Sequence, residues 1–299
     1  MRRQGYKRDL FSQFNMGAKD KQTKWWEDRG GFFGNQYMIG DNSIEGYIPG
    51  KKESLEQRTN REVDGIISLL NPRPHAWILD VPCGYGRHTI ELRKRGYFTS
   101  GVDINEEFLK IAKEQAKVVL DYKHPWEIPN FEKRDMRTLE YYSKYIGKLK
   151  WINHFDFLIN MFYSFGFFSD EENKATMKTF YDALNKERGG KLLLHTDVSP
   201  EMILQGDYRL SEIRSLKDDK KLIIREEYDP KTKRINGSWT ILNNGDSKRL
   251  TPYSVRIYSQ KEFEEMAKNC GFKETRFYGS FEGEEFNPDS KEMILVAKK

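Results

Sequence analysis

Cysteine is scarce in this sequence, with only Cys83 and Cys270 among 299 residues. Two isolated cysteines form neither a disulfide framework nor a metal-binding spacing, so the sequence predicts no metal site and favours a reducing compartment. No stretch approaches the roughly 20 apolar residues of a membrane-spanning helix. The first residues also lack the apolar segment of a signal peptide. These absences argue against secreted disulfide-rich and membrane classes and predict a cytoplasmic protein.

A strong excess of one charge is also missing, because the net charge is only +5. Residues 1–29 hold eight Lys/Arg and four Asp/Glu residues, so most of the excess lies in this arm. A basic arm can contact a phosphate-bearing partner, or it can be a solvated tail. Residues 25–50 interleave aromatic residues with glycines, which indicates either a loop over a ligand or a satellite hydrophobic cluster.

The glycine-rich turn of the chain lacks the third glycine of a dinucleotide-binding fingerprint. An apolar strand ends at Asp80 and leads into a turn that contains Gly84 and Gly86, but Thr89 occupies the third glycine position. A nicotinamide or flavin site requires G-x-G-x-x-G. A carboxylate such as Asp80 repels a pyrophosphate and attracts an ammonium. The pattern therefore favours a nucleoside ligand with a cationic amino-acid tail, such as S-adenosylmethionine.

A second carboxylate supports a ribose in the same site. Residues 97–103 form another predicted strand that ends in Asp103, where a side chain can accept both ribose hydroxyls. The competing interpretation is structural: Asp80 would cap the next helix, and the glycines would only make a turn.

With these motifs, residues 54–299 resemble a class I S-adenosylmethionine-dependent methyltransferase. The first motif of that family is matched by residues 80–86, with a departure at Pro82, where the family usually has glycine. The resemblance implies that the acidic residue of the third motif, Asp135, binds the adenine amino group. It also implies that an arginine of the helix before the first strand, Arg58, reaches the carboxylate of the cofactor. The cofactor-binding residues expected from the resemblance are Arg58, Asp80, Cys83, Gly84, Gly86, Asp103, Ile104, Asp135, Met136, Asn160 and Met161.

The predicted fold class is α/β: a Rossmann-like methyltransferase fold with a seven-stranded, mostly parallel sheet, an antiparallel last strand and helices on both faces. Apolar periodicity predicts helices over 53–71, 86–96, 105–120, 137–147, 169–188 and 259–270. Consecutive strands with tight turns over 207–258 predict an antiparallel insertion that acts as a lid over the acceptor. The predicted organisation is an N-terminal arm (1–52), a cofactor-binding core (53–206), the β lid (207–258) and the C-terminal part of the core (259–299).

A nitrogen or oxygen acceptor must lose a proton before or after it attacks the methyl group, and two side chains are candidates for a base. A neutral amine or a thiolate would need no base. His195 stands at the end of the fifth strand, and Tyr163 follows the fourth. His195 has a structural alternative, in which it bonds a backbone carbonyl. Alternating lid residues are candidates for facing the acceptor: Arg225, Glu226, Tyr228, Trp239 and Arg256.

The leading functional hypothesis is methyl transfer to a nitrogen, oxygen or sulfur atom of a small molecule. The runner-up is a macromolecular acceptor, RNA or a protein side chain, which the basic arm would favour. Residues 160–163 share only their ends with the N-P-P-Y tetrapeptide of enzymes that methylate planar amino groups. A third hypothesis is a non-catalytic cofactor-binding subunit. The oligomeric state is not predicted.

Overall fold

The structure is a computed structural model that describes residues 33, 35–41, 48, 51–120, 128–143, 147–206, 208–216 and 218–299. The predictions for the basic arm, residues 1–29, lie outside this range. Among the described helices, none combines the length and the apolar character needed to cross a membrane.

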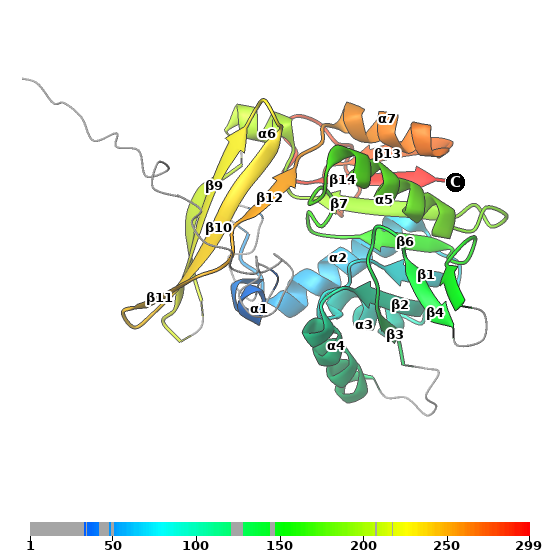
Figure 1. The fold of residues 1–299 in the computed structure, drawn as a ribbon, viewed down its shortest axis with the longest axis horizontal. Helices are drawn as coiled ribbons and strands as arrows, with labels where there is room; N and C mark the ends of the chain where they lie inside the picture. The colour runs from blue at the N-terminus through cyan, green and yellow to red at the C-terminus, as the bar shows by residue number, and fades with distance from the viewer. Residues whose placement is uncertain are drawn as a thin grey trace, which may run out of the picture.

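A seven-stranded sheet is the centre of the fold (Figure 1), and its strand order is β13-β14-β7-β6-β1-β2-β3. Within this sheet β1, β2, β3, β6 and β7 pair in parallel, whereas β14 is antiparallel to both of its neighbours. The predicted topology is therefore confirmed. The strands are β1 (Trp77–Asp80), β2 (Phe98–Asp103), β3 (Asn130–Lys133), β6 (Phe157–Asn160), β7 (Lys191–Thr196), β13 (Glu274–Tyr278) and β14 (Met293–Lys298).

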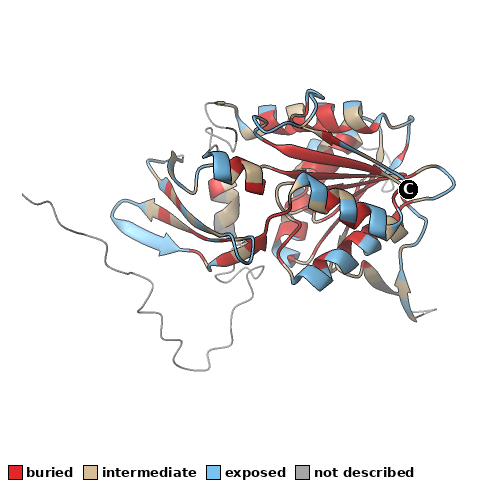
Figure 2. Cartoon of the chain, turned by 90° about the horizontal axis from the view of Figure 1, so that it is seen from above, coloured by how far each residue is buried: buried red, intermediate tan, exposed pale blue. Residues whose placement is uncertain are grey.

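Helices cover both faces of this sheet because its strands carry apolar side chains on alternate sides. Leu79 and Leu158 pack with α5 and α7 on one face, and Ile78 and Ile159 pack with α2 and α3 on the other. Figure 2 shows the buried strands between helices whose outer surfaces are exposed. The helices are α1 (Asn35–Asp41), α2 (Leu55–Leu70), α3 (Arg87–Lys94), α4 (Glu106–Val119), α5 (Asp170–Ala183), α6 (Pro200–Gln205) and α7 (Gln260–Cys270).

A second, antiparallel sheet stands at the end of the sheet where the parallel strands finish (Figure 1). It consists of β8 (Ser211–Ser215), β9 (Lys221–Asp229), β10 (Arg234–Asn243), β11 (Asp246–Arg249) and β12 (Tyr253–Arg256). Its inner face packs against the loop that follows β6, through Phe167, Ile235 and Val255. This confirms the predicted antiparallel insertion, with β11 as an additional short strand.

Two local predictions are corrected. The helix expected over 137–147 is instead a β-hairpin, β4 (Glu140–Ser143) and β5 (Gly147–Lys150). This segment contains adjacent aromatic residues, which favour strands over helices. The region 25–50, expected to be a loop, contains the short helix α1.

Candidate active site

The glycine turn after β1 brings backbone N–H groups to the carboxyl ends of the parallel strands. Gly84 donates its N–H to Asp103 Oδ2 at 2.8 Å, and Asn105 donates its N–H to Asp103 Oδ1 at 2.8 Å. Burial raises the pKa of Asp103 to about 6, although the N–H groups of Asn105 and Gly84 oppose that shift. The Asp103 carboxylate is therefore fixed in orientation, with lone pairs left for a ligand.

The two glycines of this turn have different surroundings. Gly86 has φ +85°, and a Cβ on it would lie 2.7 Å from the Cβ of Ala112. Gly84 has φ +53°, and a Cβ on it would meet no atom within 4 Å. Gly86 is thus required by packing, whereas the space beside Gly84 is open to a ligand.

A cavity of about 120 Å³ lies beside this turn, and we call it the glycine-loop cavity. It brings together residues from the ends of β1, β2, β3 and β6, as the sequence predicted. Seven of the predicted cofactor residues line it: Cys83, Gly84, Asp103, Ile104, Asp135, Met136 and Met161.

Three of the predicted cofactor residues support the glycine-loop cavity without lining it. Gly86 is the packing glycine described above. Asp80 is buried and accepts a hydrogen bond from Thr89 Oγ1 at 2.6 Å, and burial raises its pKa to about 7 against the effect of that bond. Asn160 is fully buried and donates from Nδ2 to the carbonyl of Val81 at 2.7 Å. These contacts tie the strand ends to one another behind the cavity.

The residues at the ends of β3 and β6 contribute a charged group and an apolar one. Arg137 donates hydrogen bonds to Asp135 Oδ2 from two guanidinium nitrogens, Nη2 at 2.7 Å and Nε at 3.1 Å. Burial alone would raise the pKa of Asp135, but Arg137 outweighs it and holds the pKa below its ordinary value. Met136 and Met161 are buried beside it and offer apolar surface to a flat ring.

Arg58 lies at a different place from the predicted one. It lines a second cavity rather than the glycine-loop cavity, and its Nη2 lies 3.3 Å from Asp41 Oδ1. Three arginines line the glycine-loop cavity: Arg87, Arg134 and Arg137. Arg137 holds Asp135, as described above, whereas Arg87 follows the glycine turn directly and pairs with the buried Glu62. Burial would raise the pKa of Glu62, but Arg87 and His88 lower it to about 2.

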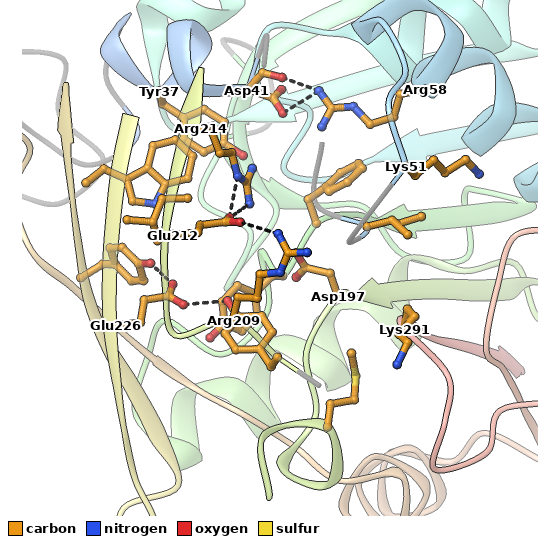
Figure 3. Close-up of a pocket in the computed structure, with 18 of the residues that line it drawn as sticks. Tyr37, Asp41, Lys51, Arg58, Asp197, Arg209, Glu212, Arg214, Glu226 and Lys291 are labelled. Carbon is orange, nitrogen blue, oxygen red and sulfur yellow. Dashed lines mark hydrogen bonds and ion pairs between the residues drawn. The ribbon is translucent and has the colours of Figure 1, made fainter. Parts of the chain in front are cut away.

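The second cavity has a volume of about 380 Å³ and lies between α1, the loop after β7 and the inserted sheet (Figure 3). We call it the insert cavity. Tyr37, on its wall, stacks on Trp239 with ring centroids 5.3 Å apart. Five residues line both cavities, so the two are contiguous: Phe33, Tyr37, Asp41, Phe162 and Phe167.

The two candidate bases are placed differently. Tyr163 lines the insert cavity, and its hydroxyl is buried without a hydrogen-bond partner among the described residues. Burial raises the pKa of Tyr163 well above its ordinary value, so the phenol stays protonated near neutral pH. His195 lines neither of these cavities: its Nδ1 accepts the N–H of Phe162, and its Nε2 lies 3.0 Å from Glu292. The geometry gives His195 a structural position, with a backbone N–H and a carboxylate as partners rather than a carbonyl.

Several lining residues were not anticipated from the sequence. Asp197 follows the end of β7. The tendency of ligands to bind beyond the carboxyl ends of parallel strands could have identified it. Asp41 comes from α1, which has no periodicity that marks a site. Tyr37, also on α1, belongs to the region 25–50, for which a loop over a ligand was one of the two interpretations. Of the five lid candidates, Glu226 and Trp239 line the insert cavity, whereas Arg225, Tyr228 and Arg256 do not.

Residues 78–190 match the family described as a methyltransferase domain. A relative from Bacillus subtilis (strain 168), the presumed methyltransferase YqeM, is 24% identical over 226 residues, which is 74% of this chain and 83% of YqeM. A relative from Geobacillus sp. (strain WCH70), also named as a presumed methyltransferase, is 27% identical over 43% of this chain; the match spans 46% of that relative, less than half its length. The chain contains a class I S-adenosylmethionine-dependent methyltransferase domain. The predicted family, enzyme class and cofactor are confirmed.

Solved structures share the fold of most of the chain. The CcbJ methyltransferase from Streptomyces caelestis superposes with a TM-score of 0.63 at 18% identity, over 79% of this chain and 88% of CcbJ. CalS10 from Micromonospora echinaspora, described as an amino pentose methyltransferase and solved with S-adenosylmethionine, has a TM-score of 0.55 at 16% identity, over 82% and 92% of the two chains.

Proposed function

We propose that this methyltransferase transfers a methyl group to a small-molecule acceptor bound in the insert cavity. The observation that carries the proposal is that the glycine-loop cavity and the insert cavity share a wall of five residues. A donor in the first and an acceptor in the second would meet at this wall. A cavity of about 380 Å³ has the size of a small-molecule site.

The residues of the glycine-loop cavity suit S-adenosylmethionine. The fixed carboxylate of Asp103 would accept the ribose hydroxyls, and the open space beside Gly84 would let the ligand approach the backbone. Asp135 would accept from the adenine amino group, with Met136 and Met161 against the ring. Cys83 and Ile104 would complete the wall, and Asp80 and Asn160 would hold the strand ends from behind.

We propose a role for Arg58 that differs from the predicted binding of the cofactor carboxylate. Because Arg58 pairs with Asp41 in the insert cavity, we assign to it the positioning of the shared wall rather than the cofactor carboxylate. Arg87, which faces the glycine-loop cavity, is the candidate for that carboxylate.

When bound, the cofactor supplies an electrophilic methyl group on a sulfonium. The chain contributes position, exclusion of water and control of one proton. Phe162 and Phe167 line the passage between the cavities and keep it apolar. Tyr163, held as a neutral phenol, orients the acceptor by hydrogen bonding and does not remove its proton.

Two further proposals follow the same architecture. The proposed cofactor-binding core consists of residues 53–206 and 259–299, the proposed acceptor lid of residues 207–258, and the proposed arm of residues 1–52.

The proposed compartment is a reducing one, such as the cytoplasm, because Cys83 and Cys270 are both free thiols.

Calorimetric titration with S-adenosylmethionine, with NAD as the control, tests the cofactor assignment. Micromolar affinity for the first ligand alone is expected. A labelled-methyl assay then compares small-molecule, peptide and RNA pools. Label in the small molecules supports the proposal, whereas label confined to peptide or RNA contradicts it.

A further inference from the structure

Some charged side chains of the insert cavity form ion pairs with one another, and others do not. Arg58 pairs with Asp41, and Glu212 pairs with Arg214 at 2.6 Å and with Arg209 at 3.6 Å (Figure 3). Within the part of the chain that the structure describes, Asp197 and Glu226 have no ion pair. The cavity therefore holds two carboxylates that no cation contacts among the described residues, while the charge of Arg214 acts on both from a distance.

These two carboxylates lie among aromatic groups. Glu226 accepts hydrogen bonds from Tyr208, at 2.8 Å, and from Tyr253. Asp197 Oδ1 is enclosed and has no hydrogen-bond partner among the described residues, and the same is true of the Tyr163 hydroxyl. An enclosed carboxylate oxygen without a donor is costly unless a ligand supplies one.

The charge of Asp197 also acts on Glu226. Burial raises the pKa of Glu226 to about 7, and the negative charge of Asp197 contributes to that rise. Burial also raises the pKa of Asp197, against the opposing charges of His195 and Arg214. Two negative groups that disfavour each other in an enclosed space favour a cationic guest.

We propose that the acceptor is an amine, which enters as its ammonium ion and binds between Asp197 and Glu226. This inference rests on the proposed function and specifies its substrate class. An ammonium supplies the positive charge that both carboxylates attract and the N–H donor that Asp197 Oδ1 lacks. An alcohol or a thiol would leave the carboxylates uncompensated, and an anionic head group would be repelled.

Three lysines also line the cavity, but they lie elsewhere in it. Lys52 and Lys291 are exposed, and Lys51 is partly exposed and lies 3.8 Å from Glu282. Figure 3 shows Lys51 and Lys291 on the side of the cavity opposite Glu226. Solvent screens such exposed charges, so they weaken the attraction of an ammonium only slightly.

Asp197 is assigned the proton transfer. The ammonium gives one proton to the Asp197 carboxylate, which leaves a lone pair on nitrogen. That lone pair forms the new N–C bond to the methyl group as the C–S bond breaks and its electron pair stays on sulfur. The products are a methylated ammonium, a neutral thioether and protonated Asp197, which then releases its proton to water. A raised pKa makes Asp197 a better proton acceptor than an exposed aspartate.

The test uses a small-molecule extract of the cells that produce the protein, divided on a cation-exchange resin at acidic pH. Each fraction is incubated with the full-length protein and methyl-labelled S-adenosylmethionine. Label in the retained, amine-containing fraction is expected. Label only in the unretained fraction overturns the amine inference and leaves the proposed function intact. No label in either fraction, while the cofactor binds, overturns both.

Variants then assign the recognition to the two carboxylates. We expect Asp197→Asn and Glu226→Gln to lower kcat/KM for the labelled fraction by about 100-fold, the usual effect of removing one partner of an enclosed charge pair. Glu227→Gln is the matched control because Glu227 is exposed on the next position of β9. Affinity for S-adenosylhomocysteine should stay unchanged in all three, which shows that each is folded. Equal activity of the Asp197 and Glu226 variants and the control overturns the assignment.

Discussion

His195 holds two consecutive residues of the turn after β6: its Nδ1 accepts the N–H of Phe162 at 3.2 Å, and its carbonyl accepts the N–H of Tyr163 at 3.1 Å. Phe162 and Tyr163 both have positive φ, +53° and +58°. Non-glycine residues adopt this conformation at a cost, and it persists only where the surroundings impose it. The turn places Phe162 between the two cavities, so His195 controls the passage indirectly.

We therefore expect His195→Ala to lower kcat without changing the shape of its pH profile, because the imidazole positions a turn and exchanges no proton with the acceptor. His195→Gln, whose amide oxygen can still accept from Phe162, should recover part of the activity. Steady-state kinetics across pH check this. Loss of an ionisation from the profile of the alanine variant would restore His195 as the base.

Asp103→Ala should weaken S-adenosylmethionine binding by about 10-fold to 100-fold, since hydrogen bonds to a charged group contribute about 1.5–3 kcal/mol. Calorimetric titration measures the effect. Glu107→Ala, at an exposed neighbouring position of α4, is the control and should bind normally. A folded Asp103 variant with unchanged affinity would refute the ribose assignment.

The two glycines of the turn should respond differently to alanine. Gly86→Ala is expected to lower the thermal stability markedly, because its Cβ would collide with Ala112 at a positive φ. Gly84→Ala should cost only about 1–2 kcal/mol from the backbone conformation, but it should weaken cofactor binding because the Cβ enters the open space. Thermal denaturation with and without S-adenosylmethionine separates the two effects. Equal loss of stability in both variants would contradict the proposed roles.

Glu62→Gln should lower the free energy of unfolding by about 3–5 kcal/mol, the usual cost of leaving a buried charge unpaired, here Arg87. The folded-state pKa of Glu62, about 2, lies below its ordinary value of 4.5. Its stabilising contribution is therefore complete above pH 4.5 and is lost as the pH falls toward 2. Urea denaturation at several pH values measures this. A variant with the same acid sensitivity as the parent protein would disprove it.

Binding of an amine acceptor should strengthen as the pH rises through about 7, where Glu226 loses its proton and gains its charge. In Glu226→Gln this step should disappear. The measurement is KM for the amine between acidic and mildly basic pH, with the cofactor saturating. A step of unchanged size in the variant would assign the ionisation to another group.

The sequence predicted the cofactor side of the molecule better than the acceptor side. Asp80 and Asp103 end strands that apolar patterning identifies, Asp135 follows a third, and the parallel topology then brings the three to one edge. Asp41 and Tyr37 lie on a short helix without periodicity, so only the tertiary structure shows that they line both cavities. Arg58 lines the insert cavity instead of the glycine-loop cavity for a similar reason, because a helix pattern defines a face but not the partner that an arginine finds there. The hairpin over 140–150 was missed because its strands are short and local.

The wall that the two cavities share makes their occupants interdependent. A molecule bound in one cavity contacts Phe33, Tyr37 and Asp41, and these residues also form part of the surface that a molecule in the other cavity contacts. By thermodynamic linkage, whatever factor the donor applies to the affinity of the acceptor, the acceptor must apply to the affinity of the donor. Replacement of the methyl-bearing donor by its demethylated product would then change the affinity for the methylated acceptor. The residues of the shared wall would therefore couple the release of the two products.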